Sequence, residues 1–453
     1  MAAYTLNKGE KKEFYKELMT LAIPIGLQSL LTALIGATDA LMLGRLSQDA
    51  VAAVSLANQI AFVMNLFIGG IVGGGGALMA QYWGKEDRAM VKNLLCMILK
   101  WSVTVCLIFF GLAMAVPEVL MRVYTPEGSL IDIGASYLRA VAPSYLFVGI
   151  TQCYYLKMKI EGEASKSVII SVAVLIADVT LDFFLIYVLR MGANGSAYST
   201  VAVELVALIW CVADSYGKDR IRADLPGLRW RSALITKDFL KLMLPMLASM
   251  LLWGLSITTQ SLIMGHMGSD ATAAASIAAV LLELVTCVCK GVSAGTGIIM
   301  GKLLGKSLFE KAEAYAVKFC HISIWVGIIH MALLCLIAPV VTSFFVLTEA
   351  ARHYLTVMLI FTAFYVFGYS VNTIVTCGVL PAGGDAGYDA ISVFFATWCF
   401  ALPLALLGTF LFKWPVLVVY ILMRLDEIVK LPFIYPRYKK YLWLNNLTRE
   451  DGL

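Results

Sequence analysis

The sequence predicts an all-α integral membrane protein, with twelve transmembrane helices in two pseudo-symmetric six-helix lobes. Three observations predict this fold class. The 453-residue chain is 60% hydrophobic and 14% charged, with a mean hydropathy of +0.83, whereas about a quarter of the residues in soluble domains are charged. Long apolar stretches recur along the whole chain, and a section of its first half is repeated in its second half.

The apolar stretches are each long enough to cross about 30 Å of hydrocarbon as a helix. They lack the alternation of apolar and polar residues that marks membrane strands, and only helices and closed barrels satisfy the backbone in lipid. The twelve expected helices cover residues 18–44, 53–80, 93–117, 131–156, 167–189, 196–216, 238–265, 273–300, 314–345, 353–379, 387–411 and 415–436.

Basic residues are unevenly distributed between the segments that connect these helices. With the N-terminus placed in the cytoplasm, twenty-six Lys and Arg residues fall in the termini and the cytoplasmic loops, and six fall in the outer loops. Cytoplasmic loops carry such an excess of positive charge. The sequence therefore predicts a multi-pass protein of the cell inner (plasma) membrane with both termini in the cytoplasm.

The same pattern divides the chain into four expected regions. Residues 217–236 are the long polar stretch of the interior and carry five basic residues, which is typical of a cytoplasmic linker. We expect an N-terminal six-helix lobe over 1–216, this linker, a C-terminal six-helix lobe over 237–437 and a cytoplasmic tail over 438–453.

The internal repeat is explicit in the sequence. Residues 24–85 align with residues 245–306 without a gap at a constant offset of 221, and 19 of the 62 positions are identical. Shared membrane composition explains matches of Leu and Ala, but not those of Pro, Gly, Asp and Lys. Because each half contains an even number of helices, both halves share one orientation, and the axis that relates them runs along the membrane normal. We expect a site at the interface of the halves that opens alternately to each side.

Three aspartates fall inside predicted membrane helices. Asp39 is in the middle of the first helix, and Asp178 and Asp182 are four residues apart and so share one face of the fifth. An aspartate at the bilayer centre costs about 2.5–3.5 kcal/mol on insertion scales, so such a residue indicates function. If the three converge, their mutual repulsion must be relieved by a proton or by a bound cation such as sodium. The alternative is that one or two of them pair with a Lys or Arg, of which the neighbouring segments offer few.

Other polar residues in the membrane helices have two interpretations each. Glu204 lies four residues after Thr200 in the sixth helix, and either completes the acidic site or hydrogen-bonds at a packing interface. Glu283 lies within the eighth helix, seven residues before Lys290, and either pairs with it or contacts a cationic substrate or a proton.

Gln260 and Asn372 join Glu283 as candidates to line a substrate cavity; Gln260 stands at the repeat position of Asp39. Pro24 and Pro245 occupy equivalent places in the repeat and are expected to kink their helices as hinges. The glycine run over 69–76 has no phosphate-loop pattern, and predicts close packing and bending of the second helix instead.

These residues resemble those of the multidrug and toxic compound extrusion (MATE) transporters over nearly the whole chain. No single motif is specific, but their order and duplication are. The motifs are Leu21-Ala-Ile-Pro24, Asp39 with Met42-Leu-Gly44, Asp49-Ala-Val-Ala-Ala-Val-Ser55 and Gln81-x-x-Gly84-Lys85, echoed by Leu244-Pro245, Gly265-His-Met-Gly268 and Gly301-Lys-Leu-Leu-Gly305.

Within that family the chain resembles the DNA-damage-inducible branch, whose first membrane helix carries an aspartate like Asp39. The Asn-x-x-x-Asp motif of that branch reads Asp178-Val-Thr-Leu-Asp182 here, and the extra carboxylate leaves the coupling ion open between H+ and Na+. The segment from Gly192 to Thr200 is similar to the family's turn into the sixth helix. Another branch has a glutamate in the seventh helix, which is not seen here, so the resemblance favours coupling in the N-terminal half.

The resemblance implies a cation-coupled antiporter that exports amphipathic, often cationic drugs or toxic compounds by alternating access. It implies coupling at Asp39, Asp178, Asp182, Thr200 and Glu204, no cofactor besides the coupling ion, and no metal other than Na+ at the three aspartates. The expected partners are small organic molecules and the lipid bilayer, and the expected state is a monomer.

Four other functions are weighed against this one. A lipid-linked oligosaccharide or lipid flippase of the same superfamily would favour a cationic cavity, whereas the charges within these helices are mostly acidic. An enzyme is not expected, because the four histidines show no HExxH motif and no Ser/His/Asp grouping. A passive channel suits duplicated lobes with kinked helices less well, and the hydropathy excludes a soluble nucleic-acid-binding protein.

Overall fold

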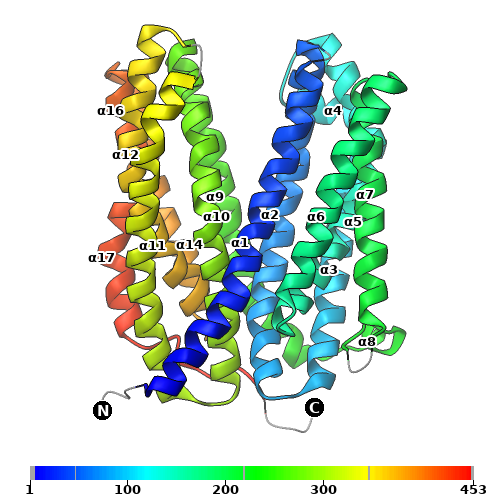
Figure 1. The fold of residues 1–453 in the computed structure, drawn as a ribbon, viewed down its shortest axis with the longest axis vertical. Coiled ribbons are helices and arrows are strands. Elements are labelled where there is room, and N and C mark those ends of the chain that lie inside the picture. Colours follow the sequence, from blue (N-terminus) through cyan, green and yellow to red (C-terminus); the bar gives the residue numbers. More distant parts are fainter. Residues whose placement is uncertain (1–5, 46, 218–219, 345–346, 450–453) are drawn as a thin grey trace. The chain divides into compact units, whose positions relative to one another are not determined.

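The computed structural model of the chain describes residues 6–45, 47–217, 220–344 and 347–449. These residues form helices joined by turns and contain no strand, which confirms the predicted all-α class. Eleven of the described helices are long and apolar enough to cross a membrane. The chain divides into two compact units, one of residues 27–243 and one that includes residues 6–26 and 244–449, and Figure 1 shows both as bundles of helices.

The division between the units passes through two helices, each close to a proline. It follows Gly26 in α1 (Lys8–Gly44) and precedes Leu244 in α9 (Ala233–His266). We call residues 27–243 the N-terminal unit and the remainder the C-terminal unit. The predicted lobe, linker and tail boundaries stay predictions, since nothing in the described chain locates the membrane.

The N-terminal unit contains the second half of α1, from residue 27, and the first turns of α9, up to residue 243. Its other elements are α2 (Gln48–Gly84), α3 (Arg88–Ala115), α4 (Pro117–Arg122), α5 (Gly128–Ile160), α6 (Ala164–Asp182), the π-helical segment η1 (Phe183–Val188), α7 (Ala193–Ser215) and α8 (Leu225–Arg229).

The C-terminal unit contains the first half of α1, up to residue 26, and most of α9. Its other elements are α10 (Ser269–Gly305), α11 (Phe309–Phe344), α12 (Glu349–Thr373), η2 (Ile374–Val379), α13 (Leu380–Ala382), α14 (Gly387–Val393), η3 (Phe394–Ala401), α15 (Leu402–Leu406), η4 (Leu407–Leu411), α16 (Val416–Met423) and α17 (Asp426–Lys439), where η1 to η4 are π-helical.

Short polar side chains fix where several helices begin. Ser47 accepts a hydrogen bond from the backbone N–H of Ala50 at the start of α2, and Asp87 accepts one from Met90 at the start of α3. Thr348 caps α12 in the same way. Each satisfies a backbone donor that the first turn of a helix leaves without a partner.

In the N-terminal unit, α5 is the central helix and packs against α2, α3 and α7. Its inner face contributes Leu138, Ala142 and Tyr145 to a core that also contains Ala57 and Met64 of α2. In the C-terminal unit, α12 packs against α10, α11 and α17 around a second core. The two cores place membrane-length helices in fixed registers around the polar sites described below.

Glycines of the repeat allow helix backbones to approach closely, as the sequence predicts. A Cβ on Gly74 of α2 would lie 2.5 Å from the Cα of Met243, at the start of α9. The equivalent residue Gly295 of α10 packs against Leu21 and Ala22, at the start of α1. The same approach is therefore built twice, once in each unit, and it joins the beginning of one repeat's first helix to the second helix of the other repeat.

The predicted twelfth helix over 415–436 is broken, which corrects the sequence prediction. The chain forms α16 and α17, with Arg424 and Leu425 between them. The second helix begins with two acids: Asp426 accepts a hydrogen bond from the backbone N–H of Glu427, and acids are favoured in a first turn by the helix dipole. Hydropathy averages over such a break because the flanking residues remain apolar.

The last turn of α17 and the residues that follow it are packed rather than free. Trp443 is fully buried, and its indole N–H donates to the carbonyl of Tyr438 at 3.0 Å. Arg437 forms two hydrogen bonds of 2.7 Å with Asp385, in the loop after α13. The end of α17 thus stabilises the loop that follows α13.

Candidate functional site

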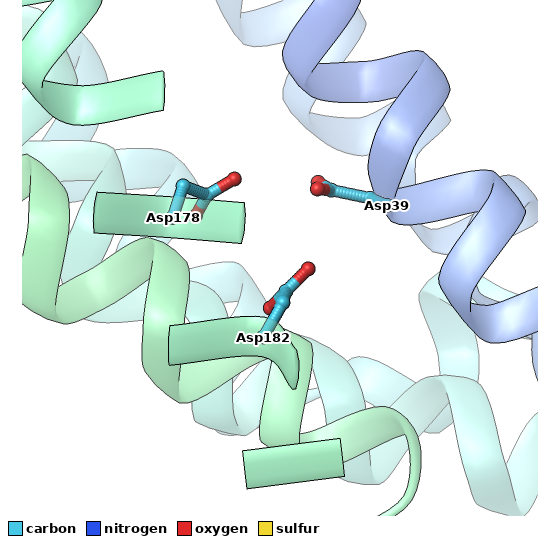
Figure 2. Close-up of side chains that lie close together, drawn as sticks. All are labelled: Asp39, Asp178 and Asp182. Atoms are coloured by element: carbon cyan, nitrogen blue, oxygen red, sulfur yellow. The ribbon is translucent and has the colours of Figure 1, made fainter. Parts of the chain in front are cut away.

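Three carboxyl groups lie together in the N-terminal unit. Asp39 comes from α1, and Asp178 and Asp182 come from successive turns of α6. One oxygen of each lies within 4.8 Å of the others, and Figure 2 shows the three side chains pointing toward one another. We call these three residues the acidic triad. The four-residue spacing puts both α6 carboxylates on one face, and the α1 residue faces them.

The two α6 members of the triad are buried, Asp39 is half-buried, and none of the three has a basic partner among the described residues. Asp178 is 1% exposed and Asp182 is 0% exposed. One oxygen of each of the three residues is buried without a hydrogen-bond partner. Within the described ranges no Lys or Arg forms an ion pair with any of them, so the alternative of simple pairing with a basic residue is not what the structure has.

Electrostatics limits the charge that the triad can carry. Two unit charges 4 Å apart repel by about 4 kcal/mol at the effective dielectric constant of 20 that suits protein sites. Three ionised carboxylates therefore require protons shared among them or a cation bound between them. Carboxylate oxygens in this arrangement suit a hard cation as well as protons.

Local structure fixes the position of each carboxylate. Ser199 of α7 donates a hydrogen bond to Asp182, and its hydroxyl also lies 2.9 Å from the carbonyl of Ser196. Directly after Asp182 the helix widens into η1, from which the hydroxyl of Tyr187 donates to the carbonyl of Met42 in α1 at 2.7 Å. This π-helical turn, a feature frequent at functional sites, ties the α6 carboxylates to the helix that carries Asp39.

Ser199 is the contact that sequence reasoning missed. It directly precedes Thr200, which belongs to the predicted set, so the sequence predicted the right turn of α7 but not the residue that contacts Asp182. The hydroxyl of Thr200 donates to the carbonyl of Ser196 at 2.9 Å, within its own helix. Glu204, one turn further along α7, does not belong to the group of carboxylates whose oxygens lie within 4.8 Å of one another in the described chain.

The C-terminal unit contains a cavity of about 410 Å³ among α9, α10, α12 and the break between α16 and α17. Gln260 and Glu283 line it, as do Trp253, Tyr365 and Arg424. Cavities of about 300–1,000 Å³ accommodate drug-sized ligands. Two of the three predicted cavity residues therefore face one cavity.

Asn372 lies outside the lining of that cavity. Its amide donates to the backbone carbonyl and to the carboxylate of Glu427, both at 2.7 Å, and so holds α12 against α17. Glu283 forms an ion pair with Lys290, which is the structural interpretation of this residue, and its carboxylate remains on the cavity wall.

The two predicted hinges lie inside long helices. Pro24 is in α1 and Pro245 is in α9, and both helices continue past the proline. A proline within a helix removes one backbone hydrogen bond and weakens the helix locally. Each lies within two residues of a boundary between the compact units.

Comparison with known proteins places the chain among membrane transporters. The family model described as MatE matches residues 24–184 and 245–407, so its two matches begin at the two repeat prolines. The uncharacterized transporter YisQ of Bacillus subtilis is 20% identical over 443 residues, which cover 97% of this chain and 97% of YisQ. Multidrug resistance protein PmpM of Pseudomonas aeruginosa is 22% identical over 400 residues, which cover 86% of this chain and 82% of PmpM.

Solved structures agree on the fold. A MOP superfamily transporter from Pyrococcus furiosus superposes with a TM-score of 0.86 at 19% sequence identity, over 97% of this chain and 99% of that chain. This likeness confirms the predicted membrane fold of twelve helices in two pseudo-symmetric lobes.

Proposed function

Since the chain belongs to the MatE family of transporters, we propose that it is a cation-coupled antiporter that exports amphipathic, often cationic small molecules by alternating access. The observation that carries this proposal is the acidic triad: three carboxyl groups within 4.8 Å of one another, two of them on buried residues and one on a half-buried residue, with no basic partner in the described chain. Such a group has no stable ionised state of its own, so its charge depends on an ion that it exchanges.

Coupling follows from the charge of the triad. On the outer side, H+ or Na+ binds at Asp39, Asp178 and Asp182, which reduces their mutual repulsion and lets α1 and α6 pack more closely. Substrate is released in that state, and the loaded protein returns to the inward-facing state. The ion drives this change only if it binds the two states with different affinity. Thr200 and Glu204 are proposed to support the site from α7.

The hinges belong to the same cycle. Pro24 lies 15 residues before Asp39 in α1, so a change in packing at the triad reaches a point where the helix bends easily. Pro245 gives α9 the same freedom at the equivalent place. We propose that the chain acts as a monomer in the cell inner membrane, with both termini in the cytoplasm.

Substrate class and family branch are parts of this proposal. The name of PmpM, a multidrug resistance protein, supports export of several chemically different compounds. Gln260 and Glu283 in the cavity of the C-terminal unit are proposed substrate contacts. The presence of Asp39 together with the pair Asp178 and Asp182 supports a place near the DNA-damage-inducible branch.

Efflux from membrane vesicles tests the proposal. A fluorescent cationic dye is loaded, a proton gradient and a sodium gradient are imposed separately, and wild type is compared with Asp39→Asn. We expect one gradient to drive export in the wild type, and the variant to lose it. Asp132→Asn, at an exposed position of α5, is the matched control and should export normally. Normal gradient-driven export by Asp39→Asn would refute coupling at the triad.

A further inference from the structure

The break between α16 and α17 directs one arginine into the cavity of the C-terminal unit. The backbone N–H of Arg424 closes the last turn of α16 on the carbonyls of Tyr420 and Ile421 at 3.2 and 3.0 Å. The next helix begins at Asp426, and Arg424 lies on the cavity wall. An arginine at this place in an unbroken helix would occupy the middle of an apolar segment.

Two tyrosine rings hold the guanidinium group of Arg424. Its central carbon lies 4.8 Å from the ring centre of Tyr365 and 5.2 Å from that of Tyr420. The hydroxyl of Tyr420 is hydrogen-bonded to Thr362 at 2.8 Å, and the ring of Tyr365 stacks on Tyr369. Aromatic faces stabilise a cation without consuming its N–H donors, so the donors remain for another group.

One of those donors has no partner among the described residues. The Nε atom of Arg424 is buried without a hydrogen-bond partner, and no carboxylate of the described residues lies within ion-pair distance of its side chain. Other charged groups nearby are paired: Glu283 with Lys290, and Glu427 with Lys430 at 2.6 Å.

Asp426, which also lines the cavity, already accepts hydrogen bonds from Thr397 at 3.1 Å and from the backbone of Glu427 at 3.0 Å. A buried donor with no partner is costly, and a planar guanidinium matches a carboxylate with two parallel hydrogen bonds.

The rest of the wall suits an aromatic ring. Trp253, Tyr365 and Tyr369 supply ring faces, and Gln260 and Thr286 supply neutral polar groups. A volume of about 410 Å³ admits a two-ring compound.

We propose that this cavity binds small aromatic carboxylates, with the ligand's carboxylate on Arg424 between the rings of Tyr365 and Tyr420. The inference rests on the proposed export function and deepens it, because it adds organic acids and zwitterions to the cationic compounds expected as substrates. The carboxylate supplies the hydrogen-bond partner that the guanidinium lacks, and the aromatic wall supplies the remaining contact area.

Calorimetric titration of the full chain in lipid nanodiscs tests the inference with a matched pair of probes. One probe is 2-naphthoate and the other is its uncharged amide, 2-naphthamide. We expect the wild type to bind the acid at least tenfold more tightly than the amide, and Arg424→Gln to bind both alike. The control Arg352→Gln, at an exposed position of α12, should keep the wild-type preference.

A second variant, Arg424→Lys, keeps the test informative if Arg424→Gln does not fold. It keeps a cation between the two rings but cannot form the paired hydrogen bonds, so the preference should fall at least threefold. Equal affinities in the wild type, or an undiminished preference in the lysine or glutamine variant, would overturn the inference. The titration uses no ion gradient, so it is independent of the antiport proposal. If gradient-driven dye export is absent but the wild type still prefers the acid, only the antiport proposal is contradicted. If export is normal but the wild type binds acid and amide alike, only the carboxylate-binding inference is contradicted.

Discussion

At the scale of single residues, the acidic triad concentrates charge where the fold gives it no counter-ion. Asp178 and Asp182 are almost fully buried, and Asp39 faces them from another helix. A stable apolar core would not contain this arrangement, because each ionised member destabilises the others. The cost is consistent with a site selected for ion exchange rather than for stability.

Asp178→Asn should therefore stabilise the protein while it impairs transport. The amide keeps the shape of the side chain and removes one charge, which relieves repulsion by up to about 4 kcal/mol per close pair. We expect a higher melting temperature than wild type at pH 8 without sodium, together with loss of gradient-driven efflux. Asp132→Asn, exposed on α5, should change neither quantity. A variant less stable than wild type would argue that Asp178 has a structural role.

A second charged cluster gives a pH prediction outside the membrane helices. Glu163, between α5 and α6, receives two hydrogen bonds from Arg220, at 2.5 and 2.9 Å, and one contact from Lys166 at 3.1 Å. Partial burial alone raises the pKa of Glu163, but the hydrogen bonds and charges of Lys166 and Arg220 outweigh it and hold that pKa below its ordinary value.

A carboxylate with a lowered pKa in the folded state stabilises the fold above its unfolded pKa, which for Glu is about 4.3. That stabilisation is lost as the pH falls through the folded pKa. Glu163→Gln should thus lower the free energy of unfolding at pH 7 by at most about 1 kcal/mol, because the pair is partly exposed, and the melting temperature should fall with it. The difference from wild type should be smaller at pH 3. Glu127→Gln, exposed before α5, is the control. A difference that persists unchanged at pH 3 would contradict the ion-pair explanation.

At the scale of helices, glycine sets how closely the repeats can pack. Gly74→Ala places a Cβ 2.5 Å from the Cα of Met243, and Gly291→Ala places one 2.3 Å from the carbonyl oxygen of Ala22. Neither neighbour is a flexible side chain, so the backbones must separate. Each substitution should destabilise by about 1–3 kcal/mol.

Gly111→Ala in α3 is the matched control for these two variants. A Cβ at Gly111 meets no atom within 4 Å, and alanine is the better helix former by about 1 kcal/mol. The melting temperature of the purified protein should therefore fall in Gly74→Ala and Gly291→Ala and rise in Gly111→Ala. A stabilising effect of alanine at Gly74 or Gly291 would show that the close approach is not present in the folded protein.

The helices themselves are predictable from sequence because length and hydropathy determine them. The pairing of Asp178 with Asp182 on one face follows from helical geometry alone. The break at Arg424 and Leu425 and the role of Ser199 do not, since both depend on contacts with residues distant in sequence, such as Thr397 and Asp182. Hydropathy likewise does not predict the burial of Trp443, because this residue lies outside the predicted membrane helices.

At the scale of the whole molecule, the two repeats form similar helices but carry different polar side chains. Asp39 in the first repeat corresponds to Gln260 in the second, so the acidic triad forms in the N-terminal unit and Gln260 faces the cavity of the C-terminal unit. Duplication thus gives two similar bundles with different polar contents.

The central claim is that one ion site controls substrate affinity, and such coupling is reciprocal. The most direct measurement is the affinity of the purified protein for a cationic dye as H+ and Na+ are varied separately, in wild type and in Asp39→Asn. The account predicts that one ion weakens dye binding to the wild type at least tenfold, and that the variant binds the dye with an affinity independent of that ion. An unchanged ion dependence in Asp39→Asn would contradict it.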